Sequence, residues 1–486
     1  MGNKKITSAL LAGLAIAFSG IWGGCGDAGL DGPNHFDPAY GLAQSDAKTL
    51  NTTIKTMPPA VSNSPTAKFT FTCNQAPCTF KCSLDFSAFK ACATPKTYKN
   101  LATGDHVFQV EAVKSGKTDS TPANYWWNFS YMGTQVSGGT YHTCALTSLG
   151  GAQCWGTNDE GRLGNGTTVN SKVPVPVSGL SSGLSAISAG YFHSCALTTG
   201  GGVKCWGYNY DGELGNGSTG DSKVPTNVSG LSSGISQIFA GNNHSCVLAN
   251  SGAVRCWGLN NVGQLGDGST ANRKVPVTVS GLTSGVSAIA SGGYHACALT
   301  TGGAVKCWGY NYDGELGDGS TANRKAPVNV SGLTSGVTAI AGGQYHTCAL
   351  ISGGIVCWGA NSDGRLGDGT TVDRHVPAAV TGSVAGVSAI DAGGFHTCAI
   401  ISGGAKCWGS NMRGQLGDGS TVGHLTPAYV SGMTSQTTAI SAGNWHACAA
   451  TSSGAVKCWG YNFNGQLGDG STTDRHAPVA VFGFVP

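Results

Sequence analysis

Histidine and cysteine recur together seven times in this sequence, and both are residue types that bind metals or do redox chemistry. Each unit is a His-x-Cys followed nine or ten positions after its cysteine by Cys-Trp-Gly. Alternate residues of a strand share a face, so each histidine could join its two cysteines around a zinc ion. The histidines are His142, His193, His244, His295, His346, His396 and His446.

The spacing of the repeated cysteines favours disulfides over metal sites. Five pairs are ten positions apart and two are nine apart, and the intervening turn shortens from Thr301-Gly302-Gly303 to Ser352-Gly353 in the shorter repeats. This change keeps the cysteines opposite each other in an antiparallel hairpin, within disulfide range. The repeats also lack the C-x-x-C spacing of zinc knuckles. We therefore predict disulfides, with metal ligation and free buried thiols as alternatives. The pairs are Cys144–Cys154, Cys195–Cys205, Cys246–Cys256, Cys297–Cys307, Cys348–Cys357, Cys398–Cys407 and Cys448–Cys458.

The other five of the 19 cysteines divide into a set of four and a single residue. Cys73, Cys78, Cys82 and Cys92 form an even set, so we predict two further disulfides and leave their pairing open. Such a cysteine content is typical of an oxidising compartment.

Residues 1–25 have the pattern of an export signal. Lys4 and Lys5 precede the apolar run 9–18, and small residues end in Gly23-Gly24-Cys25. This ending resembles a bacterial lipoprotein cleavage site, although Trp22 stands where that motif normally has leucine. We expect an exported monomer, lipid-anchored through Cys25 at a bacterial membrane or cell surface, and otherwise secreted or periplasmic.

The repeated histidines are 51 or 50 residues apart, a period typical of repeat architectures. Gly-rich turns separate four short runs of β-type residues in each repeat, which in the fourth repeat are 286–289, 295–299, 304–308 and 327–330. These runs predict four-stranded antiparallel blades. We expect the first strand of the array, at 135–138, to complete the last blade.

The repeats resemble the regulator-of-chromosome-condensation family over residues 133–486. In the fourth repeat the shared motif is Trp308-Gly309, Asn311, Gly314, the segment 316–319 and Pro327. This resemblance implies a seven-bladed β-propeller, and the cysteine pairs depart from the family pattern. The expected fold class is therefore all-β.

Two segments precede the propeller. Residues 26–65 are polar and lack a periodic apolar pattern, which predicts a flexible linker. Residues 66–131 contain β-type runs at 67–73, 106–113 and 125–131, and resemble the immunoglobulin-like β-sandwiches of bacterial surface proteins. Such modules usually act as spacers.

Several function classes are disfavoured by composition. Charged residues make up only 10% of the chain and the formal net charge is +3, so we expect no nucleic-acid partner and no membrane contact beyond a lipid anchor. A histidine repeated seven times indicates a scaffold, and no carboxylate pair is distinctive to one blade. We therefore predict no enzyme activity, cofactor or metal. The recurring aspartates indicate turns rather than calcium sites; they are Asp267, Asp318, Asp368, Asp418 and Asp469.

Binding residues are expected where the repeats vary. The position before each repeated histidine is aromatic in six repeats, and these six residues are the predicted partner-binding set: Tyr141, Phe192, Tyr294, Tyr345, Phe395 and Trp445. A second variable set follows the Trp-Gly turn and comprises Tyr208, Tyr210, Tyr310, Tyr312, Tyr461 and Phe463. Exposed aromatics on a rigid face are favoured anchors, although the first set could instead pack between blades.

The predicted function is an extracytoplasmic binding module that presents an aromatic-rich propeller face to a protein or a glycan. The alternative is a secreted enzyme inhibitor, because a secreted bacterial propeller of similar architecture inhibits β-lactamases. A hydrolase or lyase is less favoured. The GTPase exchange activity of the family's namesake is also disfavoured, since the constant period leaves no room for its protruding β-wedge.

Overall fold

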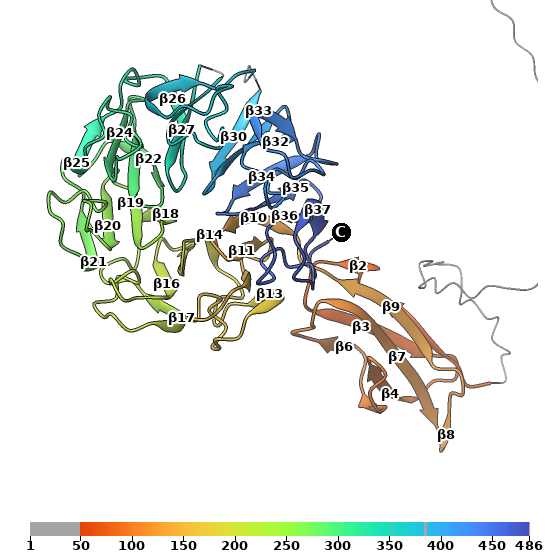
Figure 1. Ribbon diagram of the computed structural model, residues 1–486. Helices are drawn as coiled ribbons and strands as arrows, with labels where there is room; N and C mark the ends of the chain where they lie inside the picture. The colour runs from red at the N-terminus through yellow and green to blue at the C-terminus, as the bar shows by residue number, and fades with distance from the viewer. Residues whose placement is uncertain (1–48, 353, 383–385, 486) are drawn as a thin grey trace, which may run out of the picture. The chain divides into compact units, whose positions relative to one another are not determined.

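The computed structural model describes residues 49–352, 354–382 and 386–485. The predicted export signal and Cys25 lie outside these residues. Every secondary-structure element assigned within the described ranges is a β-strand, which confirms the all-β class (Figure 1).

Two sheets form the domain that precedes the repeats. One has the strand order β1-β3-β6, and the other has the order β2-β9-β7-β4-β5, with β8 paired to β7. Phe69, Phe108 and Trp127 are buried in a shared core. The strands are β1 (Thr52–Thr56), β2 (Val61–Ser62), β3 (Ala67–Cys73), β4 (Thr79–Leu84), β5 (Lys90–Cys92), β6 (Lys96–Tyr98), β7 (Gly104–Lys114), β8 (Lys117–Thr118) and β9 (Ala123–Phe129).

The predicted linker boundary at residue 65 is wrong for β1 and β2, which belong to these sheets. The hydroxyl of Thr52 donates to Asp119 and accepts from the backbone N–H of Ala112, at 2.7 and 2.8 Å. The sequence concealed β1 because it is an edge strand with little buried surface, so its apolar pattern is weak.

The repeats form four-stranded antiparallel sheets, each built from four consecutive strands: β10–β13, β14–β17, β18–β21, β22–β25, β26–β29, β30–β33 and β34–β37. Figure 1 shows them arranged around a centre. The first strands are β10 (Gly133–Gly138), β14 (Leu184–Ala189), β18 (Ile235–Ala240), β22 (Val286–Ser291), β26 (Val337–Gly342), β30 (Val387–Ala392) and β34 (Thr437–Ala442). The second strands are β11 (His142–Thr147), β15 (His193–Thr198), β19 (His244–Ala249), β23 (His295–Thr300), β27 (His346–Ile351), β31 (His396–Ile401) and β35 (His446–Thr451).

The outer half of each sheet contains its third and fourth strands. The third strands are β12 (Ala152–Gly156), β16 (Val203–Gly207), β20 (Val254–Gly258), β24 (Val305–Gly309), β28 (Gly354–Gly359), β32 (Gly404–Gly409) and β36 (Val456–Gly460). The fourth strands are β13 (Ser171–Pro176), β17 (Ser222–Asn227), β21 (Arg273–Thr278), β25 (Arg324–Asn329), β29 (Arg374–Ala379), β33 (His424–Tyr429) and β37 (Arg475–Ala480). The four runs predicted in the fourth repeat thus overlap β22–β25, the last of them over residues 327–329.

Ring closure differs from the expectation. The first strand of the array, β10, pairs with β11 in its own sheet and does not complete the last one. It instead packs beside β34 and β35. A short segment after the last strand adds a parallel bridge between Tyr131 and Phe484. Because every repeat already supplies four strands, the ring closes by the same sheet-to-sheet packing that joins neighbouring blades.

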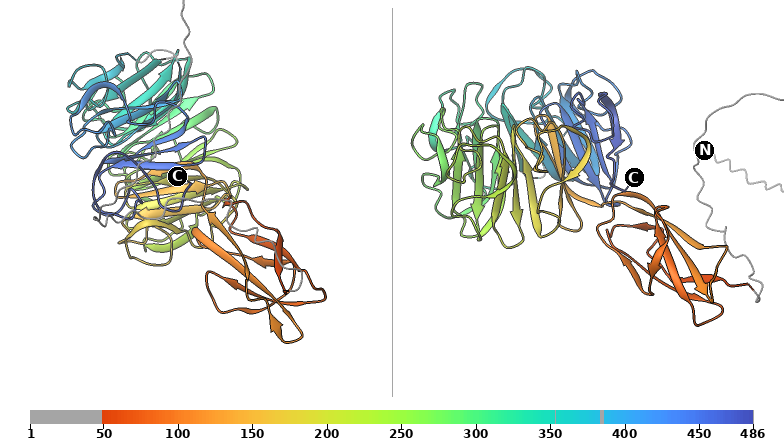
Figure 2. Two further views of the ribbon diagram at one scale, coloured as in Figure 1. Left: turned by 90° about the vertical axis from the view of Figure 1, so that its right-hand side faces the viewer. Right: turned by 90° about the horizontal axis from the view of Figure 1, so that it is seen from below.

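A fully buried tryptophan joins each sheet to the one before it. The indole N–H of Trp308 donates to the carbonyl of Gln264 at 3.0 Å, and Trp358 makes the same bond to Glu315 at 2.8 Å. At the closing interface Trp155 donates to Gln466 at 2.8 Å. The apolar cores also lie between successive sheets, which the side views of Figure 2 show beside one another. Each blade is therefore stabilised by its neighbours.

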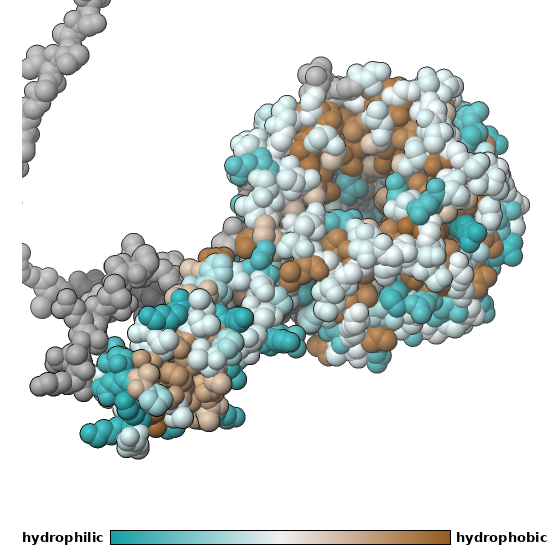
Figure 3. Space-filling view, turned by 180° about the vertical axis from the view of Figure 1, so that it is seen from behind, coloured by the Kyte–Doolittle hydropathy of each residue, from teal (hydrophilic) through white to brown (hydrophobic). Residues whose placement is uncertain are grey.

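The first strands line a central cavity of about 310 Å³. Its walls include Ile238, Ile340 and Ile440 together with polar residues such as Gln135 and Asp391. Figure 3 shows one end of the ring, where hydrophobic side chains surround a central hollow. Asp391 accepts hydrogen bonds from Ser441 Oγ and from the backbone N–H of Ala442, at 3.0 and 2.8 Å. Burial raises the pKa of this carboxyl to about 6.

Candidate functional site

The repeated cysteines form the predicted disulfides. Cys297 and Cys307, ten positions apart, have Cα atoms 4.1 Å apart, and Cys348 and Cys357, nine positions apart, have the same separation. The partners face each other across β23–β24 and β27–β28. The shorter turn therefore compensates for the missing residue, as the sequence predicted. The full set is Cys144–Cys154, Cys195–Cys205, Cys246–Cys256, Cys297–Cys307, Cys348–Cys357, Cys398–Cys407 and Cys448–Cys458.

The structure also decides the pairing that the sequence left open in the first domain. Cys73 pairs with Cys78, and Cys82 pairs with Cys92. The second bond joins β4 to β5, where Cys82 is opposite Lys90 and Cys92 is opposite Phe80. Local chain geometry therefore selects this pairing.

The repeated histidines hold the scaffold together, as predicted. His295 Nε2 lies 2.8 Å from the hydroxyl of Thr347 in the next sheet, and His446 makes the same contact with Thr143 across the closing interface. His244 Nε2 has no partner because the equivalent residue of the next sheet is Ala296. Burial lowers the pKa of every one of these histidines. They are consequently neutral at physiological pH.

The second and third strands bring two sets of loops to one end of the propeller. His295 pairs with Gly309 where β23 begins and β24 ends. The backbone N–H of Tyr310 donates to the carbonyl of Tyr294 at 3.0 Å. Gly309 has a φ of 105°, and a Cβ there would lie 2.6 Å from that same carbonyl oxygen. We call this end the aromatic face, defined by the loops that precede each second strand and follow each third strand.

A buried asparagine shapes each loop that follows a third strand. Asn311 Oδ1 accepts from the N–H of Leu316, and its Nδ2 donates to the carbonyls of Ser320 and Ala322. Asp318 Oδ1 accepts from both the N–H and the hydroxyl of Ser320. These bonds support the predicted turn role of the recurring aspartates, and they lower the pKa of Asp318 against the effect of its burial. The loops are therefore held rigidly from within.

The residue after each of these asparagines projects into solvent. Large apolar side chains occupy this position in four repeats, and they are among the most exposed large hydrophobic residues that the structure describes: Tyr210 (72%), Tyr312 (72%), Met412 (75%) and Phe463 (70%). Tyr208 stacks beside Tyr210, and Tyr461 stacks beside Phe463, with ring centroids 6.5 Å apart in both pairs. We call these four residues the rim. A rigid loop that exposes so large an apolar side chain is suited to contact a partner.

The six aromatics predicted to bind a partner lie inside the rim and are half-buried. Phe395 stacks on Trp445 with centroids 4.1 Å apart, and Tyr345 lies 6.5 Å from Phe395. The guanidinium of Arg365 lies over Phe395 at 5.0 Å. We call Tyr141, Phe192, Tyr294, Tyr345, Phe395 and Trp445 the inner ring. Each thus packs against neighbouring side chains and also presents surface to solvent, so packing is confirmed in part and partner binding by these residues stays a prediction.

Buried polar and charged side chains occupy one equivalent position in every repeat, directly after the Asn-x-x-Gly turn: Arg162, Glu213, Gln264, Glu315, Arg365, Gln415 and Gln466. Burial raises the pKa of Glu213 and of Glu315 to about 7. Arg365 Nη1 donates to the carbonyl of Gly394 at 3.0 Å and is paired with Asp363. Arg162, Glu213 and Arg365 thus connect neighbouring loops of the aromatic face. The side chains of the other four bond within their own loop.

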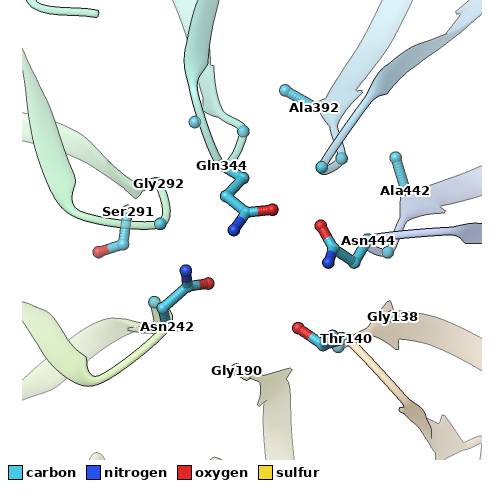
Figure 4. Close-up of a pocket in the computed structure, with 18 of the residues that line it drawn as sticks. Gly138, Thr140, Gly190, Asn242, Ser291, Gly292, Gln344, Ala392, Ala442 and Asn444 are labelled. Carbon is cyan, nitrogen blue, oxygen red and sulfur yellow. The ribbon is translucent and has the colours of Figure 1, made fainter. Parts of the chain in front are cut away.

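A polar mouth opens at the centre of the aromatic face (Figure 4). Its polar side chains include the residue two positions before the repeated histidine in four repeats, which is Asn242, Gln344 or Asn444 in three of them. Thr140 occupies the same position in the first repeat. This set was not predicted from the sequence, because the aromatic position beside it carries the more conspicuous pattern. One sequence pattern could have revealed these residues. Two positions before successive repeated histidines, polar residues alternate with glycines at Gly293 and Gly394.

The part of the chain that the structure describes contains neither a candidate metal site nor a candidate membrane-spanning helix. No group of three or more His, Cys, Asp or Glu side chains there is arranged to hold a metal ion. No helix among those residues is long and apolar enough to cross a membrane.

Comparison with known proteins identifies the repeats. The family model described as the RCC1-like domain matches residues 101–356 and 230–484. The chain belongs to the RCC1-like domain family. This RCC1-like chain is 33% identical over 199 residues to the ultraviolet-B receptor UVR8 of Arabidopsis thaliana, covering 40% of the chain and 45% of UVR8. It is 36% identical over 203 residues to the probable E3 ubiquitin-protein ligase HERC4 of Homo sapiens, covering 41% of the chain and 19% of HERC4.

Solved structures share the RCC1-like fold. Human WBSCR16 superposes with a TM-score of 0.62 at 24% identity, over 68% of this chain and 93% of that protein. Yeast RCC1, solved bound to Kap60, superposes with a TM-score of 0.60 at 21% identity, over 72% of this chain and 85% of the RCC1 chain. The RCC1-like chain spans less than half the length of UVR8 and of HERC4, so their activities do not transfer with the sequence similarity.

Proposed function

We propose that the protein is an extracytoplasmic binding module whose aromatic face captures a protein partner. The observation that carries this proposal is the rim: Tyr210, Tyr312, Met412 and Phe463 are exposed on loops that buried asparagines hold rigid. Rigid loops bind with little loss of conformational entropy. Aromatic residues, methionine and arginine are also the residue types enriched in protein interfaces.

Relatives support a protein partner rather than a small molecule. Yeast RCC1 has been solved bound to Kap60, and yeast Prp20p has been studied for its binding to Gsp1p and histones. RCC1-like propellers thus act as binding modules. The particular partners of these relatives are not proposed for this chain, since the shared identity of 21% supports the fold alone.

We also propose how the domains and a lipid anchor expose the aromatic face to the partner. The repeats would form a seven-bladed propeller, and the preceding two-sheet domain would be an immunoglobulin-like spacer. The export signal would send the chain to an oxidising compartment, where the disulfides form. Lipidation of Cys25 would anchor the chain at a bacterial membrane or cell surface. The proposal assigns no catalytic activity to the protein.

Site-specific photocrosslinking tests the proposed face. A photoreactive phenylalanine analogue is placed at Tyr210 or at Tyr312 in the full chain, expressed in its native cell. The matched control carries the analogue at Tyr429, which is also an exposed tyrosine (55%) but lies on the outermost strand β33. We expect a discrete crosslinked protein from the two rim positions and none from the control.

A triple variant then measures how much the rim contributes. Tyr210→Ala combined with Tyr312→Ala and Phe463→Ala should reduce recovery of the crosslinked partner at least tenfold in affinity capture. The free energy of unfolding should stay within about 0.5 kcal/mol of the parent, because these side chains are exposed. Tyr429→Ala should leave capture unchanged. Equal crosslinking at Tyr429, or undiminished capture by the triple variant, would refute the aromatic face as the binding surface.

A further inference from the structure

The polar mouth at the centre of the aromatic face is a small cavity of about 80 Å³. Backbone from the loops before the second strands forms its wall, and glycines at Gly139, Gly292 and Gly343 keep that wall close to the centre. Figure 4 shows the side chains of Asn242, Gln344, Asn444 and Thr140 directed toward the middle of the opening. The cavity admits a group of a few heavy atoms and excludes a strand or a helix.

Buried polar atoms in this mouth lack partners. Asn242 is only 9% exposed, and its Nδ2 has no acceptor. Gln344 donates from Nε2 to the hydroxyl of Tyr345 at 3.2 Å, which leaves its buried Oε1 without a donor. Because each unsatisfied buried polar atom costs about 1–3 kcal/mol, a ligand that satisfies them would gain affinity.

The amide side chains define the ligand's chemistry. Those that Figure 4 shows directed toward the opening, on Asn242, Gln344 and Asn444, each carry a donor NH₂ and an acceptor oxygen. A carboxamide carries the same two functions on a single planar group, so it can accept from one of these amides and donate to another. No residue that lines this cavity is charged. A carboxylate of the same shape would enter without a cation to balance it and would be disfavoured.

The mouth is held in one conformation by its neighbours. Asn242 Nδ2 and Gln344 Cγ both lie over Gly293, within 3.0 Å of the position that a Cβ would take there. Asn444 similarly lies over Gly394, whose carbonyl accepts from buried Arg365. Large and small residues therefore alternate around the opening, which lets the amide side chains lie side by side.

The surroundings of the mouth favour a protein as the source of the carboxamide. The inner ring and the rim surround the cavity with aromatic residues and Met412, a composition typical of protein interfaces. Residues that dominate binding energy usually enter central pockets that the surrounding contacts shield from water. We propose that the mouth binds the side-chain carboxamide of an asparagine or glutamine that projects from a loop of a protein partner. This inference rests on the proposed function of the aromatic face.

Selection from a loop library tests the inference without knowledge of the natural partner. Disulfide-constrained peptides of random sequence are displayed on phage and selected against the full-length protein, with the Tyr210→Ala, Tyr312→Ala, Phe463→Ala variant as the counter-selection target. We expect the selected peptides to share one Asn or Gln. Replacing that residue by the isosteric Asp or Glu should weaken binding at least tenfold at pH 8, measured by calorimetry with the synthetic peptide.

Variants of the mouth assign this preference to its residues. Gln344→Lys supplies the cation that the mouth lacks, so it should reduce the preference for amide over acid from at least tenfold to less than threefold. The matched control, Asn329→Lys on the outermost strand β25, should leave the preference intact. Circular dichroism and the unfolding midpoint of each variant establish that the fold is retained.

The outcomes separate the inference from the proposed function. Peptides that require the rim but show no Asn or Gln preference would overturn the carboxamide site, with only ordered water in the mouth, and leave the aromatic face as a binding surface. Failure to select any rim-dependent peptide would count against both. Binding of N-acetylglucosamine oligosaccharides that Asn242→Asp abolishes, without peptide selection, would assign the site to a glycan and overturn the protein source.

Discussion

At the scale of single residues, equivalent positions in the repeats carry different chemistry on the same backbone. The position after the Asn-x-x-Gly turn is buried in every repeat, yet it holds glutamine in Gln264 and glutamate in Glu315. The backbone carbonyls of both accept the indole N–H of the next sheet, so this structural role is independent of the side chain. The two glutamates, Glu213 and Glu315, instead introduce titratable carboxyl groups. Burial raises the pKa of each of these groups to about 7.

The substitution Glu315→Gln should therefore stabilise the protein in a pH-dependent way. The unfolded carboxyl ionises near its ordinary pKa of 4.5, whereas the folded one keeps its proton until about pH 7. The unfolded state thus binds fewer protons in this window, and stability falls as pH rises from 4.5 to 7. Urea unfolding measures this difference. At pH 8 the free energy of unfolding of the variant should exceed that of the parent by on the order of 1–3 kcal/mol, and below pH 4.5 the two free energies should be equal. A difference that is constant with pH would contradict the assignment.

At the scale of elements, each disulfide is confined to one hairpin between a second and a third strand. Cys297 and Cys307 are almost fully buried and close a loop with a separation of ten residues, whereas Cys348 and Cys357 have a separation of nine. In the shorter type of hairpin the turn contains Ser402, with a φ of 52°, followed by Gly403 with a φ of 77°. Positive φ at two successive residues is the geometry of the two-residue turn that fits the strand twist. The hairpins thus tolerate a deletion without losing register.

Removing a hairpin disulfide should cost similar stability in either type of repeat. Cys297→Ala with Cys307→Ala should lower the free energy of unfolding by about 2–3 kcal/mol, because the unfolded chain regains the entropy of the small loop. Cys348→Ala with Cys357→Ala should give a loss within about 0.5 kcal/mol of that value, since loop length enters only logarithmically. Urea unfolding under non-reducing conditions measures both. A markedly larger loss in one hairpin would mean that its register depends on the disulfide.

At the scale of the whole molecule, the disulfides do not join one blade to the next, so non-covalent contacts hold the ring. The same pair of bonds recurs at internal and closing interfaces. Thr347 connects His295 to the carbonyl of Glu315, and Thr143 connects His446 to the carbonyl of Gln466. The contact between first and last sheets is thus equivalent to the internal interface between His295 and Thr347.

Loss of this hydroxyl should destabilise the two interfaces equally. Thr143→Ala and Thr347→Ala should each lower the unfolding free energy by about 1–3 kcal/mol, because each leaves a buried histidine nitrogen without a partner. The reverse change, Ala296→Ser, would give His244 its missing partner and serves as a control of opposite sign. Hydrogen exchange that increases only in β10 and β11 of Thr143→Ala would instead reveal a weaker closing interface.

The sequence by itself determined the features that depend on neighbours along the chain. The strands of each repeat, the cysteine pairs of each hairpin and the turns around Asp318 all follow from spacing over a few residues, where turn geometry limits the alternatives. Tertiary structure decided what depends on contacts across the ring. It placed Tyr312 in solvent and Trp445 in a half-buried stack, although both occupy variable aromatic positions. It also brought Asn242, Gln344 and Asn444 from separate repeats to one opening, since convergence at the centre is a property of the closed ring.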